Sequence, residues 1–223
     1  MNTIFRGDLR SRRGRALAWL DSLLVDHALL RLVWTNFAAV VPGRLYRGNH
    51  PTPGRLAALT RRLGLKTIVN LRGRNKGGSD ALSRDMAARL GLDLIDAPLR
   101  SRRAPDKAGM LHLINALQQM REPAFIHCKS GADRAGLAAA IYLLLQGARV
   151  AEARQQLSWR HGHIARAETG ALGEFLAAYA RDAEGRIPFA DWVRDEYDPA
   201  ALDRAHRAGG VAGFVNDRVL RRE

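Results

Sequence analysis

A cysteine and an arginine stand six residues apart in the middle of the chain, with a glycine between them. Cys128 precedes Arg134, and Gly131 lies in the intervening loop. The apolar run 124–127 predicts a strand that ends at Cys128, and the segment from Arg134 onward predicts a helix. Open α/β sheets bind ligands at the carboxyl ends of their strands, where a helix N-terminus offers unpaired N–H groups and a positive dipole end. The spacing therefore predicts an anion site with a nucleophile at its base.

The residue types in this loop suit the transfer of a phosphoryl group. Backbone N–H groups at a helix N-terminus stabilise a thiolate, which would make Cys128 a nucleophile at neutral pH. The planar guanidinium of Arg134 can hold two phosphoryl oxygens, and Gly131 lets the backbone curl around the anion. An inert buried cysteine is the alternative, and the strand–loop–helix context argues against it.

Strand and helix patterns alternate on both sides of this loop, which indicates an α/β fold. Short apolar runs without strict alternation are typical of a buried parallel sheet covered by helices on both faces. We therefore expect a three-layer domain with a mainly parallel central sheet. Expected strands cover 37–41, 44–47, 67–71, 92–97 and 124–127, and expected helices cover 53–63, 79–90, 106–121, 134–146, 150–160 and 168–182. The predicted division is a basic lead-in (1–42), a catalytic domain (43–182) and a helical extension (183–223) with helical patterns around Trp192 and Leu202.

The loop resembles the His-Cys-x5-Arg signature of the cysteine-dependent protein tyrosine and dual-specificity phosphatase superfamily, with His127 as its first residue. The segments 43–47 and 65–72 are similar to the start of small bacterial dual-specificity-like phosphatases, which resemble plant and fungal enzymes acting on phosphoinositides and inositol pyrophosphates. The resemblance covers about residues 43–180. It implies a dual-specificity-phosphatase-like fold and a cysteinyl-phosphate formed on Cys128, with Arg134 binding the phosphoryl group. The resemblance also implies that the backbone amides of 129–134 form the phosphate cradle, and the phosphate-binding residues there are Lys129, Ser130, Gly131 and Ala132. Water then releases phosphate, and neither a metal nor another cofactor is required.

Two positions depart from the family pattern. The residue after the arginine is usually Ser or Thr, whose hydroxyl assists the second step, whereas Ala135 stands here and implies a slow second step. The general acid also has three candidates. Asp133 ranks first because a similar Asp-Arg pair occurs in the loop of some bacterial tyrosine and lipid phosphatases. Asp106, second, stands where a helix cap would, and Asp96, third, lies 32 residues before Cys128 at a strand end, where a structural carboxylate is the alternative.

The strongly basic composition favours an anionic substrate. The chain carries 36 Lys and Arg against 22 Asp and Glu, a net charge of +14. Loops that follow neighbouring strands converge on one sheet edge, so the basic segments 72–76 and 100–103 should border the cradle. We therefore expect a phosphoprotein, inositol phosphate or phosphoinositide as substrate. Solvated surface arginines are the alternative. The predicted substrate-binding residues are Arg72, Arg102 and Arg103.

Other classes of function stay open at this point. A phosphate-binding pseudo-phosphatase is compatible with Ala135 and the unsettled acid. An RNA 5′-phosphatase or a nucleic-acid binder would also use the positive charge, although the chain has no aromatic stacking ladder. A sulfurtransferase is a further alternative, less favoured because its cysteine loop does not require an arginine at this spacing. His161 and His163 have no spacing typical of metal ligands, which favours a packing or capping role.

Composition also predicts where the protein is located. Cys128 is the only cysteine, so no disulfide framework is expected. The N-terminal sequence lacks the apolar core of a secretory signal, and its longest uncharged stretch, 32–43, is too short to cross a bilayer. We expect a cytoplasmic protein. A basic amphipathic pattern over 6–34 predicts a helix docked on its own domain, with peripheral contact to an anionic membrane as the alternative.

Overall fold

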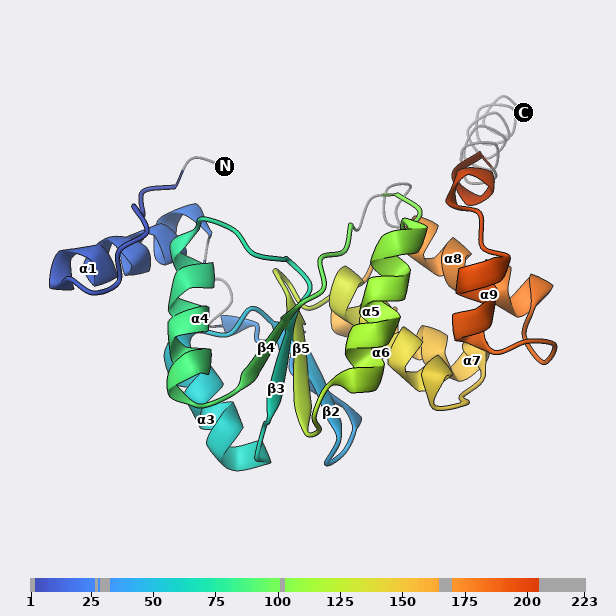
Figure 1. Ribbon diagram of the computed structural model, residues 1–223, viewed down its shortest axis with the longest axis horizontal. Helices are drawn as coiled ribbons and strands as arrows, with labels where there is room; N and C mark the ends of the chain where they lie inside the picture. Colours follow the sequence, from blue (N-terminus) through green and yellow to red (C-terminus); the bar gives the residue numbers. More distant parts are fainter. Residues whose placement is uncertain (1–2, 27, 29–32, 101–102, 165–169, 205–223) are drawn as a thin grey trace, which may run out of the picture.

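A five-stranded sheet forms the centre of the described structure, a computed structural model that covers residues 3–26, 28, 33–100, 103–164 and 170–204. Its order is β1-β2-β5-β3-β4 (Figure 1). The pairs β2–β5, β5–β3 and β3–β4 are parallel and β1–β2 is antiparallel, so the mainly parallel sheet is confirmed. The strands are β1 (Ala38–Val41), β2 (Leu45–Asn49), β3 (Thr67–Asn70), β4 (Asp93–Asp96) and β5 (Ala124–Cys128).

Helices cover both faces of this sheet, as the alternating pattern predicts. α3 and α4 lie on one face, and α5 and α6 lie on the other (Figure 1). Alternate residues of β5 face opposite layers, because Phe125 packs with the α3–α4 cluster and Ile126 with the α5–α6 cluster. The second cluster continues through Phe189 and Trp192, so the segment after residue 182 shares the main core. The described helices of these layers are α3 (Pro53–Leu63), α4 (Gly78–Arg89), α5 (Lys107–Gln119), α6 (Asp133–Leu145), α7 (Val150–Ala153), α8 (Gly170–Asp182) and α9 (Phe189–Asp195).

The N-terminal segment docks on this domain. Within the expected helix 6–34, the structure has α1 (Arg12–Leu20) followed by a π-helical turn, η1 (Asp21–Val25), and residues 27 and 29–32 lie outside the described part. Phe5 and Ala18 pack against Leu82 of α4. A Cβ at Gly78 would overlap the Ala18 carbonyl, so this glycine permits the close approach of α1 to α4. Within the described ranges, no helix has the length and apolarity needed to span a membrane.

The segment after α6 departs from the predicted helix over 150–160. The α-helix there is only Val150–Ala153, and two short 3-10 turns follow, η2 (Arg154–Gln156) and η3 (Trp159–His161). The backbone carbonyl of Gln156 accepts a hydrogen bond from the buried Arg47 guanidinium at 2.6 Å instead of continuing an α-helical ladder. The chain therefore turns back toward the loop after β5.

Candidate active site

Cys128 lies at the base of a tight loop between the central strand and α6. Its side chain is buried, and the Gly131 N–H donates a hydrogen bond to Sγ at 3.2 Å. Gly131 has φ +79°, and a Cβ there would lie 2.6 Å from the Gly48 carbonyl carbon of β2. A residue with a side chain would therefore push the loop away from the sheet. No side chain caps the N-terminus of α6, so its first N–H groups are available to an anion.

A cavity of about 520 Å³ opens above this loop. Three polypeptide segments meet around it: the catalytic loop, the β3–α4 loop and the N-terminal segment. Arg134 reaches its wall from α6 and donates a hydrogen bond from Nη1 to the Leu71 carbonyl at 3.4 Å. The charged and polar residues lining it are Thr3, Asp21, Asp26, Arg72, Asn75, Lys76, Ser79, Lys129 and Arg134.

Arg72 reaches this cavity, but its guanidinium also has a partner in the N-terminal segment. Both terminal nitrogens bind the Asp26 carboxylate at 2.8 Å, and Nη1 lies 3.2 Å from His50 Nδ1. Lys129 Nζ lies 3.7 Å from the same carboxylate. Asp26, which sequence reasoning missed, thus offsets part of the positive charge in the cavity wall.

The two other predicted substrate-binding arginines belong to the loop before α5. Arg103 is exposed and does not line the cavity, and Arg102 lies outside the described residues.

Arg47 holds the catalytic loop from beneath and was not among the predicted site residues. Its fully buried guanidinium donates from Nη2 to the carbonyls of Gly131 at 2.7 Å and Ala132 at 3.0 Å, and from Nη1 to Gln156. Burial lowers the pKa of Arg47 to about 10, so the group stays charged at neutral pH. By binding these two carbonyls, Arg47 fixes the backbone of the loop that follows Cys128. Its position within the expected strand 44–47, in a sheet expected to be covered on both faces, is the signal that could have found it.

Comparison with protein families decides the family. A family model described as "DSP-PTPase phosphatase fused to NAD+ Kinase" matches residues 38–171. The chain belongs to this DSP-PTPase phosphatase family. It is therefore a cysteine-dependent phosphatase of the dual-specificity type, and the predicted family membership and enzyme class are confirmed.

Solved structures with a similar fold include two proteins that match this DSP-PTPase over most of their length. The core catalytic domain of the Saccharomyces cerevisiae PP-IP phosphatase Siw14 in complex with citrate has a TM-score of 0.54 at 21% identity, covering 73% of this chain and 96% of that one. TpbA from Pseudomonas aeruginosa has a TM-score of 0.50 at 21% identity, covering 78% and 91%. Both confirm the predicted fold class. No curated protein matches the sequence.

The three candidate acids of this DSP-PTPase have different surroundings. Asp133 stands beside Arg134 at the start of α6, and its Oδ1 lies 2.8 Å from Nδ1 of the buried His163. Asp106 caps α5 by accepting the Gly109 N–H at 2.7 Å. Asp96 accepts hydrogen bonds from Arg84 at 2.7 and 2.9 Å, and from Asn70. Asp106 therefore caps a helix and Asp96 holds Arg84, which are the structural roles expected as the alternatives for these two residues. Asp133 belongs to the catalytic loop.

The turn 158–163 completes the surroundings of the catalytic loop. Asn36 Nδ2 donates to the Ser130 carbonyl at 3.1 Å and to the His161 carbonyl at 2.8 Å, which ties the loop to this turn. His163 follows; it is buried, which agrees with the packing or capping role expected from sequence, and its Nδ1 also contacts Asp133. No spacing rule joins residues 133 and 163, so sequence offered no signal for this pair.

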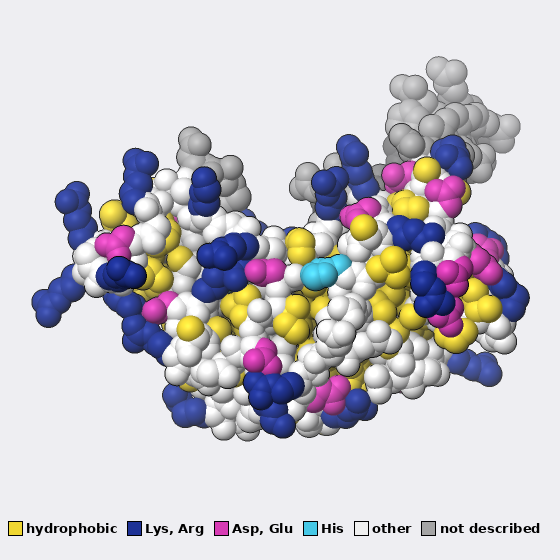
Figure 2. Space-filling model, viewed as in Figure 1, with side chains coloured by type: hydrophobic (Ala, Val, Ile, Leu, Met, Phe, Trp, Pro, Cys, Tyr) yellow, Lys and Arg dark blue, Asp and Glu magenta, His cyan; other side chains and the backbone are white. Residues whose placement is uncertain are grey.

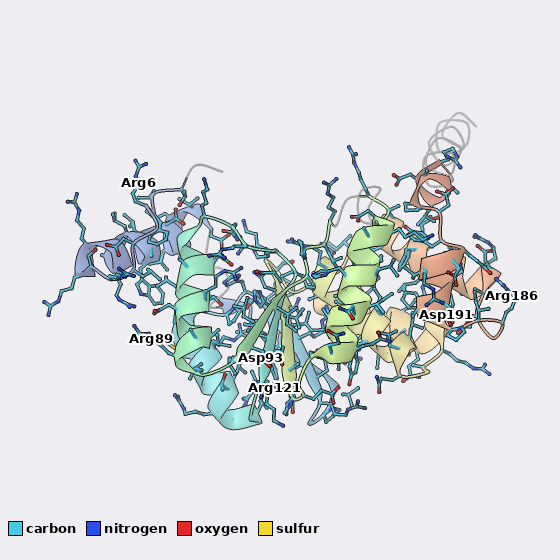
Figure 3. The ribbon with its side chains drawn as sticks, viewed as in Figure 1. Arg6, Arg89, Asp93, Arg121, Arg186 and Asp191 are labelled. Carbon is cyan, nitrogen blue, oxygen red and sulfur yellow. The ribbon has the colours of Figure 1, made fainter. Side chains whose placement is uncertain are left out.

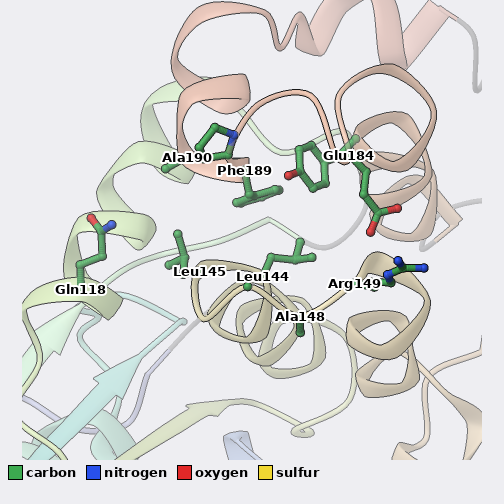
Figure 4. A pocket seen from close by; sticks show the side chains of 12 residues that line it. Gln118, Leu144, Leu145, Ala148, Arg149, Glu184, Phe189 and Ala190 are labelled. Atoms are coloured by element: carbon green, nitrogen blue, oxygen red, sulfur yellow. The ribbon is translucent and has the colours of Figure 1, made fainter.

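A larger cavity of about 680 Å³ lies between the end of α6, α8 and α9 (Figure 4). Leu144, Leu145 and Phe189 line it, with Arg149 and Glu184 also at its wall. Its lining includes no residue of the loop 128–134. The smaller cavity, by contrast, is lined by Lys129 and Arg134 from the loop and helix after β5.

Proposed function

We propose that this DSP-PTPase hydrolyses phosphate monoesters through a cysteinyl-phosphate on Cys128, with a polyanionic inositol phosphate, phosphoinositide or phosphoprotein as substrate. One observation carries the first part of this proposal. Cys128 Sγ accepts the Gly131 N–H at the base of an uncapped helix N-terminus, with Arg134 at the wall of the cavity above it. A nucleophile beneath convergent donors is the arrangement that attack on a phosphate ester requires.

The reaction has two steps. In the first, the Cys128 thiolate forms a bond to phosphorus while the bond from phosphorus to the ester oxygen breaks, and the general acid protonates the departing oxygen. Arg134 and the loop amides hold the three phosphoryl oxygens throughout. In the second step, water attacks phosphorus, the S–P bond breaks, and phosphate leaves. Ala135 offers no hydroxyl to the departing thiolate, which favours a slow second step.

Asp133 is the general acid in this proposal, with His163 as its positioning residue. The 2.8 Å contact with His163 engages Oδ1 and leaves Oδ2 of the same carboxyl group for the leaving oxygen. The hydrogen bond between His163 Nδ1 and Asp133 Oδ1 holds the carboxyl group in place beside Arg134. The partners of Asp106 and Asp96 occupy those carboxylates in structural roles.

Asp133→Asn is expected to slow hydrolysis of an alkyl phosphate by about 100-fold or more, the usual contribution of general acid catalysis. Hydrolysis of p-nitrophenyl phosphate should fall far less, because nitrophenolate departs without a proton. Steady-state kcat for both substrates gives the ratio. His163→Ala should move this ratio in the same direction by a smaller factor. Asp106→Asn is the matched control, and a ratio that responds to Asp106→Asn but not to Asp133→Asn would reassign the acid.

The cations around the cavity support a substrate with more than one phosphate. Arg134 is committed to the transferred phosphoryl group in this mechanism, and Arg72 is bound to Asp26. Lys76 and Lys129 line the same cavity, and the exposed Arg103 stands on the loop before α5. These three cations can meet anionic groups that lie beyond the reacting phosphate. Siw14, which shares the fold, is itself a PP-IP phosphatase.

The double variant Lys76→Ala/Arg103→Ala should raise KM for an inositol polyphosphate about tenfold, because each exposed cation contributes up to ~1 kcal/mol. KM for p-nitrophenyl phosphate should stay nearly unchanged, since that substrate has no second anionic group. Added salt should reduce the difference between the two proteins. Arg61→Ala/Lys66→Ala, near the opposite end of the sheet, is the matched control. Equal losses on both substrates would contradict selection of polyanions.

A further inference from the structure

The exposed large apolar side chains of the described structure come from only two segments, residues 4–34 and 159–164. Single exposed apolar side chains are ordinary, but eight in two short segments indicate a binding surface. Trp19, Trp34 and Trp159 are three of the four tryptophans in the chain, although tryptophan is usually well buried. The eight are Ile4 (38% exposed), Trp19 (38%), Leu20 (43%), Leu24 (56%), Val33 (91%), Trp34 (59%), Trp159 (82%) and Ile164 (58%).

Both segments border the catalytic loop. On one side, Thr3 and Val25 line the active-site cavity together with Arg134, so Ile4 and Leu24 adjoin its wall. On the other side, the ring of Trp34 lies so close to Gly162 that a Cβ there would come within 2.8 Å of it. Asn36 joins the turn that follows Trp159 to the Ser130 carbonyl. The eight exposed apolar side chains named above, with the exposed arginines of the same described segments, are called the docking edge below.

Unpaired positive charge accompanies these apolar side chains. Lysine and arginine side chains project along the upper edge in Figure 2, the edge to which the parallel strands point in Figure 1. Within the described ranges, the exposed arginines of the docking edge make no ion pair with a carboxylate. By contrast, Arg121 forms an ion pair with Asp93 at 2.6 Å at the other end of the sheet. Figure 3 shows this pair at the lower end of the sheet, away from Arg6. The exposed arginines of the docking edge are Arg6, Arg10, Arg12, Arg13 and Arg160.

We propose that the docking edge binds an anionic lipid bilayer and thereby turns the active-site cavity toward the headgroups. Tryptophan side chains favour the membrane–water interface, where one end is apolar and the other hydrated. Arginines beside them gain from the negative surface potential of an anionic leaflet. A nucleic acid would use the arginines but not Val33 or Leu24, and an uncharged apolar partner would not use the arginines. The bilayer is the occupant that matches both.

This inference rests on the proposed function in one respect: it says where the phosphate ester would be held. A phosphate carried by a lipid would reach Cys128 without leaving the headgroup layer. The docking itself requires no catalytic turnover, so binding and hydrolysis can be measured separately.

The test is co-sedimentation of the full chain with vesicles of phosphatidylcholine, alone or mixed with phosphatidylglycerol. We expect binding to the mixed vesicles, much weaker binding to phosphatidylcholine alone, and loss of binding as salt rises.

Arg160→Gln should reduce the vesicle partition coefficient about fivefold. Trp159→Ala should reduce it on the order of tenfold. Arg61→Gln and Lys66→Gln, near the opposite end of the sheet, are matched controls and should bind as the unmodified chain does. Trp159 is 82% exposed, so its replacement leaves the core intact.

Each remaining outcome overturns the proposal. Failure of the unmodified chain to bind mixed vesicles excludes the bilayer. Equal binding by Trp159→Ala, Arg160→Gln and the controls would assign binding to net charge alone. A dimer that dissociates in Trp159→Ala, seen by sedimentation velocity, with no vesicle binding would make the docking edge a protein interface. Hydrolysis of p-nitrophenyl phosphate without vesicles is measured alongside: its absence would contradict the proposed function and leave the binding result standing.

Discussion

Cys128→Ser is expected to abolish phosphatase activity, by on the order of 10⁴-fold or more, while the fold stays intact. The Cys128 side chain is buried at the end of the central strand, and serine is smaller than cysteine, so the substitution fits the site. A serine hydroxyl is not ionised at neutral pH and is a far weaker nucleophile than a cysteine sulfur. The chemical step loses its nucleophile, and the binding groups remain. Phosphate release from p-nitrophenyl phosphate measures the loss.

The single cysteine makes this prediction easy to check by independent means. Because Cys128 is the only cysteine in the chain, alkylation by iodoacetate can label one residue only, and inorganic phosphate should protect it. Rapid quenching of the unmodified enzyme should show a covalent phosphoryl adduct that the serine variant lacks. The serine variant should still bind phosphate, measured by calorimetry, because Arg134 and the loop amides are unchanged. Activity close to that of the unmodified enzyme in this variant would refute the cysteinyl-phosphate mechanism.

Arg47→Met should have the second largest effect, because it removes the support of the catalytic loop. Arg47 donates to the carbonyls of Gly131, Ala132 and Gln156; methionine removes this donor from the Gly131 and Gln156 carbonyls, while the Ala132 carbonyl keeps the Gly136 N–H. We expect the free energy of unfolding to fall by about 3 kcal/mol, since each buried unpaired group costs about 1–3 kcal/mol. The kcat of the folded protein should fall by about 100-fold, because the loop N–H groups lose their alignment. Denaturant unfolding and steady-state kinetics measure the two effects.

Arg44→Met is the matched control for this variant. Arg44 precedes the same strand, but its guanidinium binds Glu122 at the surface through Nε at 2.7 Å. Its loss should change stability by less than about 1 kcal/mol and leave kcat unchanged. If Arg47→Met kept its kcat and lost only stability, Arg47 would serve the core alone and not the alignment of the loop.

Local chemistry explains why much of this structure could be predicted from sequence. The strand–loop–helix arrangement around Cys128 follows from an apolar run, a loop glycine and a helix that starts within the next six residues. The boundaries of α3 follow from Pro53 in its first turn and Gly64 at its end, where φ is +63°. Parallel pairing follows from strands that are buried along their whole length. Each of these features depends on neighbours within a few residues, and sequence patterns report such neighbours directly.

Contacts between distant segments decided the rest of the site. The register Gly48↔His127 and Asn49↔Cys128 brings β2 alongside the catalytic strand and Arg47 beneath the loop, and the turn after η3 brings His163 to Asp133. Asp26 reaches Arg72 only because α1 docks on α4. The strength of a hydrogen bond or ion pair depends on distance and burial, which long-range packing sets and sequence spacing does not encode. The sequence by itself therefore determined the nucleophile, its phosphate loop and the layered sheet, and only the tertiary structure decided which distant side chains hold that loop and which cations remain free for the substrate.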